Sequence, residues 1–175
     1  MKPLLFIVTF CVLTIFAGCK SSPTNSAKTQ PTPQPPKESP APLEDAAYKA
    51  QLSFVDPPTK LRVGQQVRVQ IKIKNDSSIS WWARGGPVNS RDDNKFYIAA
   101  GNRWLKAGSL QTDMDGRVGI GKDLKPGEET EVSLLVQAPK DPGEYELEVD
   151  LVQEQVAWFH DKGSPTVKTK VTVVK

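Results

Sequence analysis

Apolar and polar residues alternate along several stretches of the chain between residues 67 and 174. Residues 67–74 read VRVQIKIK, residues 131–136 read EVSLLV, residues 144–151 read EYELEVDL, and a last stretch covers about residues 166–174. Successive side chains of a strand point to opposite faces, so this period of two predicts strands that bury one face. No stretch shows the apolar repeat of 3.6 residues that would predict a helix.

Turn-forming residues separate these predicted strands. Proline, glycine and aspartate cluster at residues 56–58, 115–116, 125–127 and 141–143, and such clusters are typical of turns. We expect seven or eight short strands between residues 46 and 175, each with one apolar face. This pattern predicts an all-β antiparallel sandwich in which two sheets pack their apolar faces together.

The outward positions of the predicted strands carry charges that are mostly of one sign on each strand. They are acidic in the stretch at residues 144–151 (Glu144, Glu146, Glu148 and Asp150) and basic in the last stretch (Lys168 and Lys170). We expect these side chains to face solvent and, if the two strands are neighbours, to pair across them. The formal net charge of +3, with both signs interspersed, gives no reason to expect nucleic-acid binding.

The N-terminal end has a different composition. Lys2 precedes an apolar run over residues 4–17, which is too short to span a bilayer and fits the apolar region of a signal peptide. We therefore predict that residues 1–18 are removed as a signal peptide. Cys11 falls in that segment and leaves Cys19 as the one remaining cysteine, so no disulfide is expected.

The residues at the predicted cleavage point are Phe16-Ala17-Gly18-Cys19. They resemble the lipobox of bacterial lipoproteins, with Phe16 where leucine is usual. The resemblance implies that lipid is attached to Cys19 and holds the protein on a membrane of the cell envelope. Lys20 stands where an aspartate would retain a lipoprotein in the inner membrane, so the outer membrane is favoured if the source has two membranes. An ordinary secretory signal with an incidental cysteine is the alternative.

Residues 19–45 form a predicted tether. Residues 21–44 contain seven of the 15 prolines and almost no large apolar side chain. This composition cannot bury enough apolar surface to offset the entropy of ordering, so we predict a disordered, partly polyproline II segment. We interpret it as a passive spacer rather than as a peptide ligand for a partner. The folded domain is then expected to cover residues 46–175.

Short motifs follow one another in a fixed order through the predicted domain. They are Asn75 with Trp81, Trp104-Leu105, Pro126-Gly127-Glu128, Pro142-Gly143-Glu144-Tyr145, and DLVQEQVAWF at residues 150–159 with Gly163. The ordered set resembles a bacterial immunoglobulin-like module that is found beside glycosyltransferases and other envelope-associated proteins. The resemblance implies an immunoglobulin-like sandwich with Trp81 in the core. It also implies that Tyr145 is a tyrosine-corner residue, whose hydroxyl ties a loop to its strand.

Trp82 departs from this module, which commonly has proline at that position. Because neighbours on a strand point to opposite faces, a buried Trp81 requires Trp82 to point outward or to lie under a loop. Trp82 then either packs beneath residues 83–94 or contacts a ligand or partner. The same rule applies to Trp158 and Phe159, one of which is expected inside. The candidate contact residues are Trp82, Trp104, Trp158 and Arg84.

The chain lacks the residue sets that enzymes commonly use. His160 is the only histidine, and no nucleophile-elbow, zinc-protease or phosphate-loop motif occurs. Asp113-Met114-Asp115-Gly116 is similar to part of a calcium loop, but the downstream glutamate is missing, and we interpret it as a turn. We therefore expect no metal, no cofactor and no catalysis.

The leading hypothesis is a lipid-anchored, non-catalytic envelope lipoprotein whose immunoglobulin-like domain serves binding or accessory roles. Besides the membrane, its partner would be an envelope or cell-wall polysaccharide that stacks on tryptophan rings. Alternatively, the domain would be a docking module for an envelope protein. A small envelope hydrolase, with catalytic carboxylates brought together by folding, is the remaining alternative.

Overall fold

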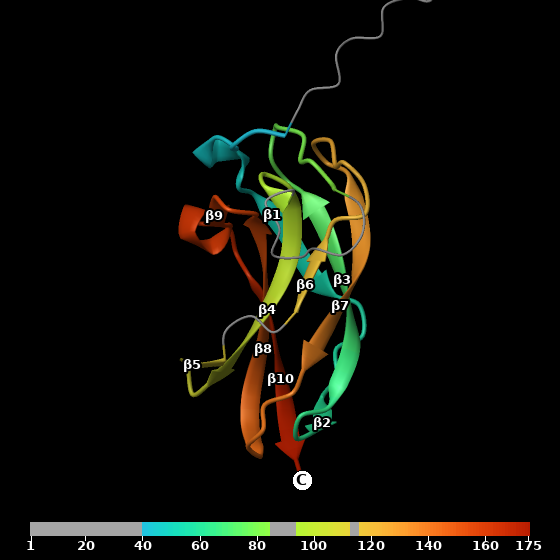
Figure 1. Ribbon diagram of the computed structural model, residues 1–175, viewed down its shortest axis with the longest axis vertical. Coiled ribbons are helices and arrows are strands. Elements are labelled where there is room, and N and C mark those ends of the chain that lie inside the picture. Colours follow the sequence, from blue (N-terminus) through green and yellow to red (C-terminus); the bar gives the residue numbers. More distant parts are fainter. Residues whose placement is uncertain (1–39, 85–93, 113–115) are drawn as a thin grey trace, which may run out of the picture. The chain divides into compact units, whose positions relative to one another are not determined.

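A computed structural model describes residues 40–84, 94–112 and 116–175, which form a two-layer β-sandwich (Figure 1). In this part of the chain two short 3₁₀ turns are complete, η1 (Asp45–Ala47) and η3 (His160–Lys162). Neither is long or apolar enough to cross a membrane. The predicted signal peptide, Cys19 and residues 20–39 of the predicted tether lie outside the described residues.

The strands form two sheets. The first sheet has the order β1-β3-β7, with β1 at Ala50–Phe54, β3 at Gln66–Asn75 and β7 at Glu129–Gln137. The second has the order β2-β10-β8-β4-β5, with β2 at Lys60–Arg62, β10 at Val167–Val174, β8 at Gly143–Gln153, β4 at Ile98–Lys106 and β5 at Ser109–Thr112. Two short strands complete it: β6 (Arg117–Gly119) pairs with β4, and β9 (Ala157–Trp158) pairs with β8.

The all-β sandwich predicted from the alternating pattern is confirmed, with two differences. The described residues contain ten strands rather than seven or eight, because β2, β6 and β9 are too short for an alternating pattern to reveal them. One pair of strands, β2 with β10, is parallel. Pro57 and Pro58 lie where the chain leaves β1 and crosses to the second sheet, and proline cannot donate a hydrogen bond to continue a ladder.

The core lies between the apolar faces that the alternating pattern predicts. On β3 the buried side chains are Val69, Ile71 and Ile73, and on β7 they are Val132, Leu134 and Val136. Trp81 is fully buried, as predicted, and its ring meets the edge of Phe159 at 5.1 Å between centroids. Phe159 is the inward member of its pair, since it is fully buried while Trp158 is half-buried.

The ordered domain begins before residue 46, so the predicted boundary was placed too late. Buried Gln153 holds the preceding segment with both ends of its amide. Its Oε1 accepts hydrogen bonds from Leu43 N at 3.0 Å and from the Tyr48 hydroxyl at 2.7 Å, and its Nε2 donates to Ala41 O at 2.8 Å. Residues 41–48 therefore pack on the sandwich instead of belonging to a disordered tether.

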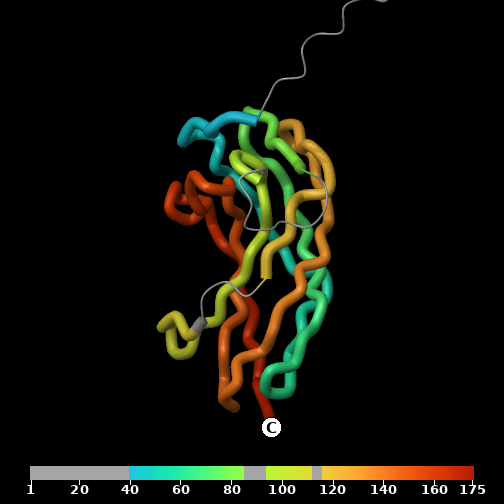
Figure 2. The backbone as a smooth tube through the Cα atoms, viewed as in Figure 1, coloured from blue at the N-terminus to red at the C-terminus, as the bar shows by residue number. Residues whose placement is uncertain are grey.

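The two ends of the sandwich are built by different segments. Figure 2 shows the described chain starting at one end and β10 finishing at the other. Near the end where β10 finishes, the Tyr145 hydroxyl donates to Asp141 O at 3.0 Å, which confirms the expected tyrosine-corner bond.

Candidate functional site

Trp82 lines an open groove at the end of the sandwich where the described chain begins. The groove has a volume of about 520 Å³ and is lined by Ala41, Pro42, Leu43, Glu44, Ile79, Ser80 and Trp82. Trp82 itself is half-buried. One wall is therefore the N-terminal segment that Gln153 holds, and the other is the turn that follows β3.

Buried Asn75 shapes the second wall. Its Nδ2 donates to Ile79 O at 2.8 Å and to Leu124 O at 2.9 Å, and its Oδ1 accepts from Ser77 N at 3.0 Å. These bonds close the turn that presents Ile79 and Ser80. They give a physical reason for the motif in which an asparagine precedes Trp81 by a few residues, because the same turn delivers Trp81 to the core.

Backbone hydrogen bonds fix the direction of Trp82. Trp81 N donates to Leu124 O at 2.9 Å, and Leu124 N donates back to Trp81 O at 3.0 Å. One residue later, Trp82 O accepts from Ile98 N at 3.0 Å. Because the chain is extended across these bonds, Trp81 enters the core and Trp82 turns toward the groove.

The interpretation that Trp82 packs under a loop concerns residues 83–94, of which residues 85–93 lie outside the described part of the chain. The flanking residues are held in place. Ala83 N donates to Asp123 Oδ1 at 2.7 Å, and the Arg84 guanidinium donates from Nη1 to Asn94 Oδ1 at 2.8 Å. Arg84 is half-buried and lies two residues after Trp82 in sequence, but it is absent from the groove lining.

The prediction that Trp104 contacts a ligand or partner is wrong. Its side chain is fully buried on the inner face of β4, where its ring meets the edge of Tyr145 at 6.2 Å between centroids. Its indole Nε1 donates to Gln137 O at 2.7 Å. Arg103 takes the outward position instead, so the ring of Trp104 offers no surface to a ligand.

Trp158 is half-buried and already has a partner on its ring. The Arg117 guanidinium carbon lies 4.6 Å from the ring centroid, which is cation–π geometry. Arg117 is held there by an ion pair, with Nη1 at 2.8 Å from Glu154 Oε1. Because one face of Trp158 is covered, Trp82 is the better candidate for stacking on a ligand.

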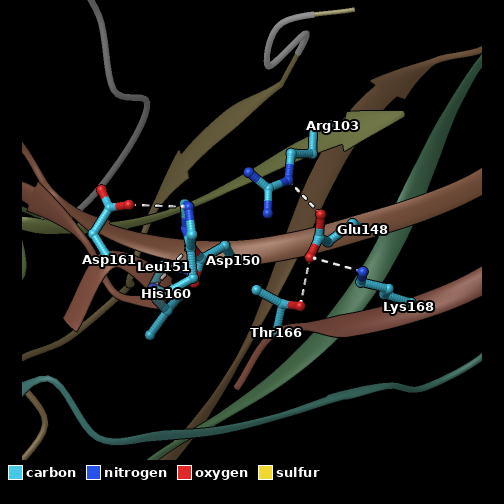
Figure 3. Close-up of polar contacts among 8 residues, drawn as sticks. All are labelled: Arg103, Glu148, Asp150, Leu151, His160, Asp161, Thr166 and Lys168. Atoms are coloured by element: carbon cyan, nitrogen blue, oxygen red, sulfur yellow. Dashed lines mark hydrogen bonds and ion pairs between the residues drawn. The ribbon is translucent and has the colours of Figure 1, made fainter. Parts of the chain in front are cut away.

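The outer face of β8 carries a second group of polar residues (Figure 3). The expectation that Glu148 and Asp150 face solvent was wrong, since their exposed fractions are 2% and 1%. Arg103 Nε donates to Glu148 Oε2, the Thr166 hydroxyl donates to Oε1 at 2.6 Å, and Lys168 Nζ lies 3.4 Å from Oε1. Although burial raises the pKa of Glu148, the hydrogen bonds from Arg103 and Thr166 and the nearby positive charges lower it to about 2.

Asp150, two residues further along the same face, is bound mainly by His160. The His160 ring Nδ1 lies 2.5 Å from Asp150 Oδ2, and Leu151 N donates to Oδ1 at 2.7 Å. His160 Nε2 lies 3.2 Å from Asp161 Oδ1. Burial raises the pKa of Asp150, and the bonds from His160 and Leu151 only partly oppose that effect.

His160 therefore holds a loop in place. Among the described residues no hydroxyl or thiol is hydrogen-bonded to it. The same part of the chain contains no group of three His, Cys, Asp or Glu side chains that could hold a metal ion. Residues 113–115 of the motif that is similar to a calcium loop lie outside the described residues. The sequence did not reveal this polar group, because its members come from β4, β8, the turn η3, Thr166 and β10.

No protein-family model and no curated protein matches the chain. Among solved structures it is similar to a β-glucosidase from Listeria innocua, with 14% identity over 73% of this chain and 16% of that chain and a TM-score of 0.41. The CARDB domain of the PF1109 protein from Pyrococcus furiosus gives 14% identity, 72% and 91% coverage and a TM-score of 0.42. The sporulation control protein Spo0M from Bacillus subtilis gives 13% identity, 73% and 49% coverage and a TM-score of 0.40.

These similarities are weak. Each of the three TM-scores is below 0.5 and each identity is below 20%, so they assign no activity, ligand or partner to the chain. The immunoglobulin-like sandwich rests on the strand order and core of the chain itself.

Proposed function

We propose that this chain is a lipid-anchored, non-catalytic binding module of a bacterial cell envelope, and that its Trp82 groove binds a glycan. The single observation that carries the proposal is the position of Trp82. Trp82 lines an open groove of about 520 Å³ together with Ser80 and Glu44, whose side chains carry a hydroxyl and a carboxylate.

Glycan binding suits this combination of groups. Sugar rings present apolar C–H faces that pack on an indole, and hydroxyl groups at their edges that need hydrogen-bond partners. Binding sites for small ligands have volumes of about 300 to 1,000 Å³, and the groove falls in that range. Pro42, Leu43 and Ile79 supply further apolar contact.

The groove lining supports the non-catalytic part of the proposal. Glycoside hydrolysis commonly uses two carboxyl groups that flank the scissile bond, and among the described residues Glu44 is the one carboxylate that lines this groove. The buried carboxylates Glu148 and Asp150 are engaged by Arg103 and His160 on the outer face of β8. The lipid anchor and envelope location rest on the lipobox at Cys19 and on the proline-rich segment that follows it.

The test uses the full chain in non-ionic detergent and co-sedimentation with purified peptidoglycan and with insoluble envelope polysaccharide. We expect Trp82→Ala to weaken binding about tenfold, because it removes the stacking surface. Trp158→Ala is the matched control, since Trp158 is also half-buried but Arg117 covers one of its faces. It should bind as the parent chain does.

Three outcomes would overturn the proposal. If neither polymer sediments the parent chain, the proposal that the domain binds these glycans is wrong. If the two variants lose binding equally, the groove is not the binding site. If the purified chain degrades either polymer, the proposal that the chain is non-catalytic is wrong. Melting temperatures of both variants show whether a loss of binding reflects a loss of folding.

Protein docking is the second candidate, and the apolar side chains of the groove lining favour it. A partner would insert an apolar side chain between Leu43 and Ile79 and pack on Trp82. A photo-crosslinking residue at position 43 distinguishes the two functions. Docking predicts a crosslinked protein adduct that is lost in Trp82→Ala and persists when soluble envelope glycan is added in excess. Glycan binding predicts that the same glycan suppresses every adduct.

A further inference from the structure

A depression at the opposite end of the sandwich combines two positive charges with an amide. It is lined by Lys60, Leu61, Arg62, Gln65 and Val174 and has a volume of about 560 Å³. In Figure 1, β2 and the end of β10 lie far from the segment where the described chain begins. The depression is therefore separate from the Trp82 groove.

The pairing of β2 with β10 determines which side chains line this depression. Lys60 lies beside Thr172 and Arg62 beside Val174 in a parallel register. Leu61, between them, is 4% exposed and points into the core. Since side chains alternate along a strand, Lys60 and Arg62 project together from the outer side.

A tight turn adds the amide. Gln65 N donates to Arg62 O at 3.0 Å, and Arg62 N donates to Gln65 Oε1 at 2.8 Å. Gly64 has a φ of +68°, which favours glycine at that point of the turn. Gln65 Oε1 already accepts the bond from Arg62 N, and its NH₂ group can donate. Lys60 and Arg62 can only donate, so donors predominate among the polar side-chain groups of the depression.

The charges of Lys60 and Arg62 are not neutralised within the described part of the chain. Neither residue takes part in an ion pair there. Some cations of the sheets and of the turn η3 are paired, namely Lys72, Lys74, Arg103, Arg117, Lys162 and Lys168, whereas Arg68, Lys106 and Lys170, like Lys60 and Arg62, are not. Lys60 and Arg62 differ from those other unpaired cations because they line one depression together, which makes this end of the second sheet a positive surface.

Lys140 extends the positive surface. Gly64 N donates to Pro139 O at 3.1 Å, and Ala138 N donates to Gln65 O at 2.8 Å, so the loop after β7 lies against the turn at residues 62–65. Lys140, the next residue along that loop, is exposed.

Two carboxylates border this surface without lining the depression. Asp141 follows Lys140 in the chain. Glu144 lies in the same row as Lys60, but Thr172 separates them and donates its hydroxyl to Glu144 at 3.1 Å.

We propose that this depression binds the phosphate or carboxylate groups of an anionic polymer. Arg62 supplies a planar guanidinium that can bond two oxygens of one anionic group, Lys60 supplies a compact charge and Gln65 an amide donor. Lys140 lines a separate depression with Pro139 and Asp141. The hydrogen bond from Gly64 N to Pro139 O joins the two loops, so a second anionic group of an extended polymer can reach Lys140, whereas a single ion cannot bridge both places. The inference does not depend on glycan binding at Trp82.

The test titrates fluorescently labelled polyphosphate against the full chain in non-ionic detergent at low ionic strength. Arg62→Gln should weaken binding about tenfold, as expected for the loss of a charged hydrogen-bond partner. Lys60→Gln/Arg62→Gln should remove most of the binding. Arg62→Lys keeps the charge without the planar fork and should fall between the parent chain and Arg62→Gln. Binding should weaken as salt is added.

Lys122→Gln is the matched control, because Lys122 is an exposed lysine outside this surface that forms no ion pair among the described residues. It changes the net charge by the same amount and should alter the affinity less than about twofold. Equal losses in Lys122→Gln and Arg62→Gln would overturn the site, because net charge alone would then explain binding. Retained affinity in the double variant would overturn it as well.

A membrane is the other source of the same anionic groups. Nanodiscs of phosphatidylglycerol and of phosphatidylcholine, added in place of polyphosphate, distinguish the two sources. If the chain binds the anionic nanodiscs through Lys60 and Arg62 but does not bind polyphosphate, the proposal that the ligand is an anionic polymer is wrong. Melting temperatures close to that of the parent chain would show that the variants remain folded, as expected for exposed positions.

Discussion

The outer face of β8 is built differently in its two halves, although the same alternation places acidic residues along both. Glu144 is exposed and Glu146 half-buried, whereas Glu148 and Asp150 are 2% and 1% exposed. The difference lies in what covers them. A charge on the outward face of a strand is therefore solvated only where no other segment returns over that face.

The covering segment is the chain after β9. Phe159 N donates to Leu151 O at 2.9 Å, and the buried ring of Phe159 anchors the return. The turn η3 then places His160 on Asp150, and Thr166 follows with its hydroxyl on Glu148. In the half that contains Glu144 and Glu146, Lys170 and Thr172 lie opposite the glutamates across β10. No loop among the described residues is hydrogen-bonded to the side chains of these two glutamates.

Removal of the guanidinium from the covered half should have the largest effect. Arg103→Met leaves the Glu148 carboxylate buried with only Thr166 and Lys168 as partners. Breaking one side of a buried ion pair strands the other charge, so we expect a loss of about 3 kcal/mol in the free energy of unfolding. Urea denaturation measures it.

Arg68→Met is the matched control, since Arg68 is an exposed arginine on β3 that forms no ion pair among the described residues. It should change stability by less than about 0.5 kcal/mol. Comparable losses in the two variants would show that Glu148 does not depend on Arg103. The double variant Arg103→Met/Glu148→Met should recover part of the loss, because no buried charge is left unpaired.

Acid should destabilise the covered half through Glu148. Its pKa is about 2 in the folded chain, against an ordinary value of 4.5. A depressed pKa stabilises the fold fully above the unfolded value, and this contribution is lost as pH falls from about 4.5 to about 2. We expect about 2 kcal/mol after allowance for solvent screening.

Glu148→Gln tests this contribution, because the amide does not titrate. Denaturation of parent and variant between pH 2 and 7 should show the parent losing more stability over the acid limb. Parallel curves would contradict the prediction. Glu144→Gln removes the same charge at an exposed position on the same strand and is the control for the loss of one carboxylate.

Asp150 should show a smaller effect of opposite sign. Burial raises its pKa, so its ionised form is less favourable in the folded chain than in the unfolded one. A raised carboxyl pKa stabilises the fold below the unfolded value, and this contribution is lost as pH rises. Asp150→Asn retains an acceptor for Leu151 N and for His160 but removes the buried charge.

The stability of Asp150→Asn relative to the parent should therefore improve as pH rises from about 3 to 7. Denaturation in the same pH series measures this relative stability. A decline over that range would show that the bond from His160 outweighs the cost of burying the charge.

The sequence predicted the parts of the fold that depend on neighbouring residues. The alternation in residues 67–74 and 144–151 predicted β3 and β8, and the rule of opposite faces correctly separated Trp81 from Trp82. The two strands with opposite charges, β8 and β10, are neighbours, and Lys168 pairs with Glu148 across them, as expected for that arrangement.

The parts that failed depend on residues distant in the chain. Burial of Glu148 and Asp150 requires a loop that returns over the sheet, and period-two patterns contain no information about such a cover. Gln153 bonds Leu43, which lies 110 residues earlier in the chain. The proline-rich composition around Leu43 gave no sign that this segment packs on the sandwich. Trp104 was a candidate contact residue in the sequence, but its side chain lies on the inner face of β4 and is fully buried.

Glu146→Gln should have the smallest effect. Glu146 is half-buried, and its neighbours are Lys170 on β10 and Leu105 on β4. Among the described residues Glu146 forms no ion pair, although Lys170 lies opposite it. A solvated charge without a close partner contributes little, so the free energy of unfolding should change by less than about 0.5 kcal/mol. Urea denaturation at low and high salt measures it, and salt should make no further difference. A loss as large as that of Arg103→Met would mean that the half of β8 with Glu144 and Glu146 is also covered in solution. The two halves would then differ only in which segment covers them, and not in how far their charges are solvated.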